Sequence, residues 1–206
     1  IAVSGLSKFI KRVMNYSNGK VWLLNGTRTA KNQLVINTSN SGRSDYKTIL
    51  RSNNEMGGIE FTYSIWIFID DFTINEGQWK HILHKGNQDT WPNRAPALYI
   101  HPNENTLRVY MNTFNKIDEF ADIPNIPLQK WVNIVVSLQG KNLDIYINGF
   151  LKKRHVLSSI PRQNWGNIWI TSNGGFGGYI SNVRYYDYAV PFSEIDAIVS
   201  NGPSRK

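Results

Sequence analysis

The sequence predicts an all-β protein that folds as an antiparallel β-sandwich, preceded by a basic extension and followed by a short C-terminal helix. From Gly58 onward, apolar and polar residues alternate with a period of two, which is the pattern of strands that bury one face. Clusters of Gly, Pro, Asn and Asp separate the alternating runs and indicate turns. The composition agrees, because 41% of the residues are hydrophobic, 13% are aromatic and only 18% are charged.

The length of 206 residues suits one large domain, and the distribution of charge divides the chain into a basic N-terminal part and a balanced remainder. Residues 1–51 contain nine of the 23 Lys and Arg but only one of the 15 Asp and Glu, whereas the remainder is balanced. We therefore expect a basic N-terminal extension at residues 1–51 and the sandwich domain at residues 52–206.

The basic extension has two interpretations. It can attach the protein to an anionic neighbour, such as a membrane surface or an acidic protein, or it can be a solvated segment that only aids solubility. Apolar residues at helical spacing predict a short amphipathic helix within residues 1–19. The chain begins at Ile1 rather than Met, and the basic segment would suit the flank of a preceding anchor or signal segment. The residues expected to face the anionic neighbour are Lys8, Lys11, Arg12 and Lys20.

The elements of the sandwich follow in order from the alternation. The run GIEFTYSIWIFID predicts a long first strand over residues 58–70. Asn148-Gly149, between two alternating runs, predicts a tight type I′ hairpin, since that turn needs two positions with positive φ. Ser193 and Asp196 are spaced as a capping box and predict the start of the C-terminal helix. Further strands are predicted at residues 79–85, 97–101, 106–112, 131–139, 142–148, 150–157, 167–172 and 178–186.

The stretch GGFGG at residues 174–178 could be mistaken for a phosphate-binding loop. Such a loop leads from a strand into a helix and carries a Lys or a G-x-G-x-x-G pattern. Here the glycines lead into another strand, so we predict a structural role in a turn and in close backbone approach.

The basic run at residues 152–154 lacks interleaved aromatic residues, so it is interpreted as solvated, and no specific nucleic-acid binding is expected.

The sequence predicts neither a cofactor nor a catalytic centre. The chain contains no cysteine, which removes thiol chemistry and Cys-ligated zinc. His81 and His84 are three residues apart on a predicted strand, so we expect them to point to opposite faces and not to chelate one ion. Calcium, which takes oxygen ligands from scattered loop residues, stays open. No paired carboxylates of a glycosidase and no G-x-S-x-G occur, so we expect no enzyme activity.

The loop GNQDTWPNRAPA at residues 86–97 is the predicted recognition surface. An aromatic ring in a polar loop can stack on a sugar while its neighbours bond the sugar hydroxyl groups. In the alternative interpretation, Trp91 folds back and covers the end of the sandwich. The candidate carbohydrate-binding residues are Trp91, Asn93, Arg94 and Asp89.

Three stretches carry a resemblance to a known family. They are FTYSIWIFID, then IPLQKWVNIVVSLQGKNLDIYINGFLKK, then GGFGGYISNVRYYDYAVPFSEI. In order and spacing, over about residues 55–200, they resemble the concanavalin A-like lectin/glucanase superfamily in its laminin-G/pentraxin-like form. The matching positions are Phe61, Trp66, Pro127, Trp131, Tyr146, Asn148, Gly149, Gly178, Ile180, Arg184, Tyr186 and Ile195.

The resemblance implies a jelly-roll sandwich, a scaffold that hosts lectins, glycosidases and protein-binding modules. The glycosidase carboxylate motif is absent, and the calcium ligands of the family have no matching positions. The stretches GGIEFTYSIWIFID, HKGN and YINGFLKKRHVL also resemble lectin-like proteins of large double-stranded DNA viruses. This narrower resemblance implies a non-catalytic surface or minor capsid component of a virus particle, bound to other proteins of that assembly and located on the virion or outside the cell. The alternatives are a carbohydrate-binding lectin module and, less favoured, a glycoside hydrolase.

Overall fold

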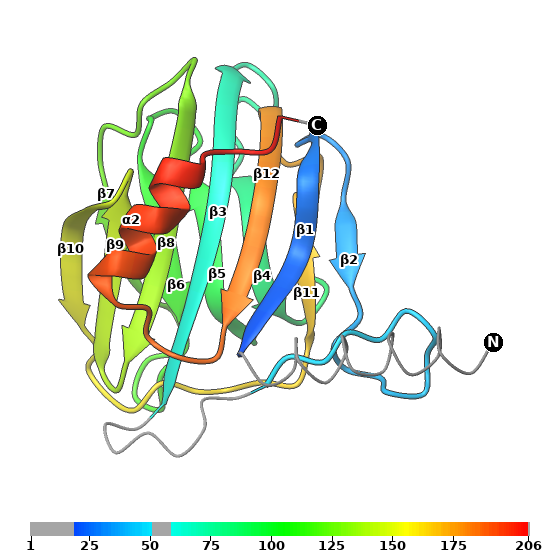
Figure 1. Ribbon diagram of the computed structural model, residues 1–206, viewed down its shortest axis with the longest axis vertical. Helices are drawn as coiled ribbons and strands as arrows, with labels where there is room; N and C mark the ends of the chain where they lie inside the picture. Colours follow the sequence, from blue (N-terminus) through cyan, green and yellow to red (C-terminus); the bar gives the residue numbers. More distant parts are fainter. Residues whose placement is uncertain (1–18, 51–58, 206) are drawn as a thin grey trace.

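The computed structural model describes residues 19–50 and 59–205, which form a sandwich of two six-stranded antiparallel sheets (Figure 1). Every strand predicted from Gly58 onward is present, and the predicted all-β sandwich is confirmed. Sheet A consists, in spatial order, of β1 (Lys20–Thr29), β12 (Gly177–Tyr186), β3 (Glu60–Asp71), β8 (Trp131–Gln139), β9 (Asn142–Ile147) and β10 (Phe150–Val156). Sheet B consists of β2 (Leu34–Ile36), β11 (Asn167–Ile170), β4 (Lys80–Gly86), β5 (Arg94–Ile100), β6 (Leu107–Met111) and β7 (Glu119–Ile123).

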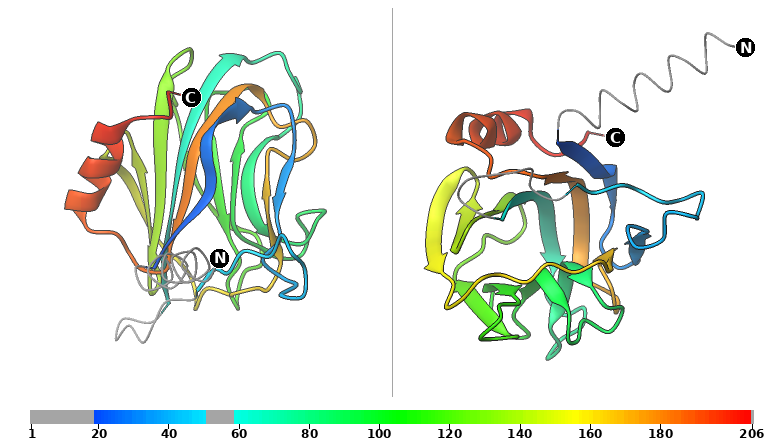
Figure 2. Two further views of the ribbon diagram at one scale, coloured as in Figure 1. Left: turned by 45° about the vertical axis from the view of Figure 1, so that its right-hand side comes forward. Right: turned by 90° about the horizontal axis from the view of Figure 1, so that it is seen from below.

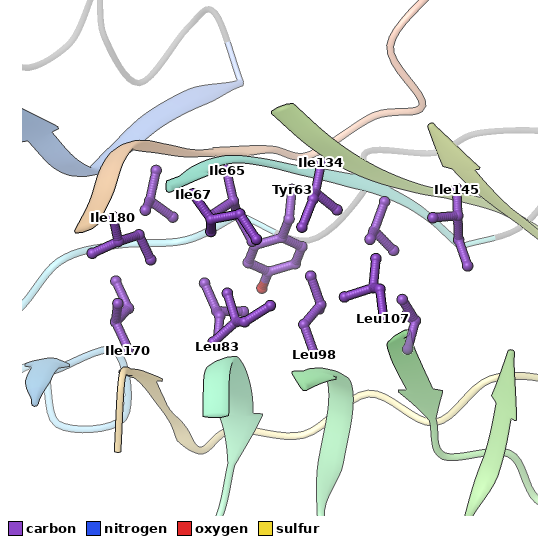
Figure 3. Close-up of a cluster of buried hydrophobic side chains, with 14 of the residues drawn as sticks. Tyr63, Ile65, Ile67, Leu83, Leu98, Leu107, Ile134, Ile145, Ile170 and Ile180 are labelled. Carbon is purple, nitrogen blue, oxygen red and sulfur yellow. The ribbon is translucent and has the colours of Figure 1, made fainter. Parts of the chain in front are cut away.

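The core lies between the two sheets and follows from the two-residue alternation (Figure 3). On β3, Ile65 and Ile67 point inward and are buried, because every second residue of a strand faces the same side. Leu98 and Leu107 of sheet B meet them from the opposite layer. Full burial of each such aliphatic side chain contributes roughly 1.5–3 kcal/mol. The predicted inward faces therefore hold the two layers together.

The predicted boundary at residue 51 is wrong, because the chain enters the sandwich much earlier. Strand β1 pairs with β12 at the edge of sheet A, and β2 pairs with β11 at the edge of sheet B. The alternation was not recognised in this segment because the register of β1 shifts twice, between Trp22 and Leu24 and between Leu24 and Thr27, which interrupts the two-residue period. The predicted helix within residues 1–19 lies almost entirely outside the described residues, as do Lys8, Lys11 and Arg12.

No strand was predicted between residues 112 and 131, but the acidic segment around residue 120 forms strand β7. It pairs with β6, with Ala121 and Ile123 buried toward the core. Its acidic residues do not prevent a strand, because Asp122 forms an ion pair with Arg108 on the neighbouring strand.

The hairpin and the C-terminal helix agree with the sequence in place but not in every detail. Asn148 and Gly149 have φ values of 51° and 85°, which confirms the predicted turn. Helix α2 (Phe192–Asn201) begins after Pro191, and no side chain caps it, so the predicted capping box from Ser193 is wrong. The helix already starts one residue before Ser193, which cannot then occupy the non-helical cap position.

The glycine-rich stretch has the predicted structural role. Gly178, in β12, has φ of 143°, and a Cβ atom there would lie 1.9 Å from the backbone oxygen of Phe68. Only glycine combines this conformation with such a close strand contact.

The two outer faces of the sandwich differ. Helix α2 lies across the outer face of sheet A, where Ile195 packs with Val135, Tyr186 and Val190 (Figures 1 and 2). Among the described residues no helix covers the outer face of sheet B, and none is long and apolar enough to cross a membrane. Helix α2 therefore distinguishes the two faces, because it covers part of sheet A and has no counterpart on sheet B among the described residues.

Candidate functional site

The outer face of sheet B carries a row of aromatic rings. Because Leu98 and Ile100 of β5 are buried in the core, the alternation turns Tyr99 outward, and in the same way Tyr110 of β6 and Phe120 of β7 point outward. Neighbouring ring centroids are 6.0 Å apart for Tyr99 and Tyr110 and 5.6 Å apart for Tyr110 and Phe120. Trp79, just before β4, extends the row with its ring 6.2 Å from that of Tyr99.

A pocket of about 360 Å³ lies on this aromatic face. Its floor comes from β4, β5 and β6, and its walls come from the segments that follow β3, β4 and β11. A second, more open depression, lined by Asn87, Gln88, Asp89 and Asn173, adjoins it and shares Asn173. The residues that line the pocket are Asn75, Gln78, Trp79, His81, Thr90, Arg94, Tyr99, Tyr110 and Asn173. The lining thus combines flat rings with amide and hydroxyl groups.

His81 lies at the pocket and contacts a second buried histidine, His84. The Nε2 atom of His81 lies 2.7 Å from Nδ1 of His84, so the expectation that the two side chains point to opposite faces is wrong. The reason is a β-bulge: the pairing of β4 with β5 shifts register between His81 and Leu83, which returns both histidines to the outer face.

Hydrogen bonds fix the protons on this histidine pair. The backbone N–H of Ser172 donates to Nδ1 of His81, so the ring proton of neutral His81 is on Nε2 and is donated to His84. His84 in turn donates from Nε2 to the backbone oxygen of Asn87. Burial lowers the pKa of both histidines, that of His84 to about 4. Both rings are therefore neutral at pH 7, and a third ligand is missing: within residues 19–50 and 59–205 no three His, Asp or Glu side chains gather as a metal site.

Two arginines lie on the same face in different electrostatic settings. Arg108 forms a two-pronged ion pair with Asp122, with both N–O distances 2.7 Å, and this bonding raises the pKa of Arg108. Arg94 instead lies over Tyr110, with its central guanidinium carbon 3.8 Å from the ring centroid. No carboxylate of the described residues forms an ion pair with Arg94.

The predicted carbohydrate-binding residues fall in different places around the pocket. Arg94 lines it, and Asp89 lines the adjoining depression. Asn93 donates from its side chain to Asn87 and holds the loop together. Trp91 is 52% exposed, with its ring centroid 5.7 Å from the Arg94 guanidinium. Of the predicted anionic-surface residues only Lys20 is described, and its ammonium pairs with Glu194 of α2 at 2.6 Å.

Most of the pocket was missed because its residues come from separated strands and loops. The lining residues that were not predicted are spread over almost 100 positions of the chain: Gln78, Trp79, Tyr99, Tyr110 and Asn173. A usable signal did exist: strands β5 and β6 place tyrosine at outward positions, where a solvated sheet would more often carry charged residues.

Comparison with known proteins places the fold in a family. Residues 22–196 match the Laminin_G_3 model, described as the concanavalin A-like lectin/glucanases superfamily. The chain belongs to this superfamily. The match begins within β1, which supports the correction of the domain boundary, and no curated protein matches the chain.

Solved structures of similar fold are receptor-binding domains of botulinum neurotoxins. The serotype D binding domain superposes with a TM-score of 0.61 at 16% identity, over 88% of this chain and 42% of that one. The serotype D ligand-binding domain, solved with N-acetylneuraminic acid, gives 0.62 at 14% identity, over 90% and 51%. A type C structure, titled for cell entry dependent on two ganglioside molecules, gives 0.54 at 16%, over 69% and 35%. The chain thus spans about half or less of these proteins, and the likeness shows the fold alone.

Proposed function

We propose that the protein is a non-catalytic carbohydrate-binding module that takes its ligand in the pocket on sheet B. The observation that carries this is the composition of that pocket: flat rings of Trp79, Tyr99 and Tyr110 beside uncharged hydrogen-bonding groups. An aromatic ring offers a surface for the C–H face of a sugar, while amides and hydroxyls match its hydroxyl groups. The volume of about 360 Å³ lies within the usual range of small-ligand sites.

The chemistry of the lining supports binding without turnover. Glycoside hydrolysis ordinarily needs two carboxyl groups roughly 5 to 10 Å apart across the scissile bond. None of the described residues that line the pocket is Asp or Glu. On the same face, Asp122 is held by Arg108.

The smaller cavity at the end of the sandwich does not suit a sugar. Its volume is about 80 Å³, and Phe61, Tyr63 and Leu50 are among its largely apolar lining. The pocket on sheet B is the larger and more polar of the two.

The proposal also includes a role for the protein in a larger assembly. Presentation of the sugar-binding face by a virus particle or an extracellular assembly is supported by the sequence resemblance and the basic N-terminal segment alone. In this arrangement Lys8, Lys11 and Arg12 contact a neighbouring protein or an anionic membrane.

A glycan array tests the proposal. The wild-type protein is expected to bind a restricted set of glycans, and Trp79→Ala is expected to weaken binding about tenfold or more by removing a stacking surface. Phe150→Ala serves as the matched control, because Phe150 is an exposed aromatic residue on β10 of the opposite sheet. Absence of binding to any glycan, or equal loss in both variants, would contradict the proposal.

A further inference from the structure

We infer that the pocket selects acidic sugars, with Arg94 binding the carboxylate of the ligand; this inference rests on the proposed carbohydrate-binding function. Three properties of Arg94 point to it: its fixed orientation, its lack of an anionic partner among the described residues, and the neutrality of the groups around it.

Arg94 is held in place before any ligand arrives. Its backbone N–H donates to the side chain of the buried Asn112 at 2.6 Å, which anchors the start of β5. Its guanidinium lies on the ring of Tyr110. A guanidinium that lies over an aromatic ring can still present N–H groups to a carboxylate in a two-pronged fashion. Because the side chain is already ordered, little conformational entropy is lost on binding.

The hydrogen-bonding capacity of Arg94 is only partly used within the described part of the chain, where its guanidinium interacts with the hydroxyl of Tyr99. Its Nε atom is buried and has no hydrogen-bond partner there. Arg108 provides the internal comparison, because on the same sheet face its guanidinium also lies over an aromatic ring, that of Phe120, yet Asp122 occupies its donors. Within residues 19–50 and 59–205, the fold thus neutralises Arg108 with a carboxylate and provides none for Arg94 at the pocket.

The remaining described lining does not compete for or cancel this charge. It contains no carboxylate, and His81 is neutral because it donates to His84 and accepts from Ser172. Asp89 lies in the adjoining depression, not in the pocket itself. The described pocket lining therefore carries one positive charge, and a ligand with one negative group complements it.

Binding to matched pairs of sugars tests the inference. We would titrate the protein with 3′-sialyllactose against lactose, and with a glucuronate-ended disaccharide against its glucose-ended counterpart, using calorimetry. The acidic member of each pair is expected to bind at least tenfold more tightly. Arg94→Gln is expected to abolish this preference, so that the ratio of the two affinities within each pair falls to about one, and Arg94→Lys is expected to retain part of it, since lysine keeps the charge but not the two-pronged geometry.

The controls separate the possible failures. Lys152→Gln removes the same charge from the exposed β10 and is expected to leave the preference intact. Equal binding of acidic and neutral sugars by the wild-type protein would overturn the inference while the proposed function stands, and this comparison needs no variant to fold. Absence of binding to every sugar would overturn the proposed function itself. Equal affinity for 3′-sulfolactose and 3′-sialyllactose would overturn the assignment of a carboxylate in favour of any anionic group.

Discussion

Glu119 is buried at the junction of β7 and β10, where its carboxylate binds several donors. It accepts hydrogen bonds from the backbone and side chain of Ser158 and from the hydroxyl of Thr113, and it is bonded to the His155 ring. Burial raises the pKa of Glu119, but these bonds outweigh burial, so the net pKa lies below its ordinary value. One residue thereby ties a strand of sheet B to the segment that leaves sheet A.

Replacing this carboxylate is expected to cost stability. Glu119→Gln puts an amide N–H₂ group where one oxygen accepts bonds, and we expect a loss of about 2 kcal/mol at pH 7, measured by urea unfolding. Because the folded pKa lies below the unfolded value, the contribution of Glu119 is present above about pH 4.5 and is lost as the pH falls through the folded pKa. Glu104→Gln, in an exposed loop, is the control. Equal stability of the Glu119 variant and wild type at pH 7 would show that these bonds contribute nothing.

At the scale of the element, β4 shows how one bulge changes the chemistry of a strand. A regular strand would put either His81 or His84 into the core, but the shifted register places both on the outer face in mutual contact. Protonation of either ring would set two N–H groups against each other, because every ring nitrogen of the pair already has an assigned partner.

The histidine pair predicts a loss of stability in mild acid. The folded pKa of both rings lies below the value of 6.5 for an unperturbed histidine, so the unfolded chain binds more protons as the pH falls from 6.5. The free energy of unfolding is therefore expected to fall between about pH 6.5 and 4, by on the order of 3 kcal/mol from His84. Urea unfolding across this range measures the loss. A double variant, His81→Gln with His84→Gln, is expected to flatten the curve, and an unchanged slope would refute this origin.

Helix α2 is held by packing rather than by its cap. Ile195 is completely buried against sheet A, whereas Ser193 forms no capping bond. We expect Ile195→Ala to lower the free energy of unfolding by about 2–4 kcal/mol and Ser193→Ala by less than about 0.5 kcal/mol. Thermal unfolding of the two variants side by side distinguishes them. A larger loss of unfolding free energy for Ser193→Ala than for Ile195→Ala would show that capping, and not packing, holds the helix.

At the scale of the whole molecule, the N-terminal segment closes the sandwich at its two edges. Strand β1 covers the edge of β12 in sheet A, and β2 covers the edge of β11 in sheet B. Residues 37–50 continue the contact, since the backbone of Thr38 bonds to Asn167 and Leu50 accepts a bond from Tyr185.

Removal of this segment is expected to destroy the fold. A chain of residues 52–206 would expose the unpaired edges of β11 and β12 together with core residues that Leu23 and Ala30 now cover. We expect it to aggregate or to unfold without a cooperative transition, whereas a chain of residues 19–206 keeps the two edge strands. Size-exclusion chromatography and circular dichroism compare the two chains. If the 52–206 chain were monomeric and folded cooperatively, the domain boundary predicted from the sequence at residue 51 would be correct after all.

The site was partly predictable from the sequence. Arg94 and the loop around Trp91 were proposed from the sequence because polar residues around an aromatic ring form a local pattern, and Arg94 lines the candidate pocket. Tyr99 and Tyr110 could have been found from the same alternation that predicted their strands, since the inward neighbours of each are aliphatic. The contact between His81 and His84 could not have been predicted, because the β-bulge depends on pairing with the neighbouring strand and has no signature in the local sequence.

The sequence by itself determined the strands from Gly58 onward except β7, the Asn148-Gly149 turn and the membership of a sandwich superfamily. Each of these depends on local spacing, because alternation decides which side chains are buried and glycine decides which turns are possible. Only the tertiary structure decided that β1 and β2 form edge strands of the two sheets and that the rings of His81 and His84 are hydrogen-bonded to each other. The tertiary structure also decided that Arg108 pairs with a carboxylate, whereas Arg94 has no such partner among the described residues. These are contacts between segments far apart in the chain, and their distances are set by the packing of the two sheets.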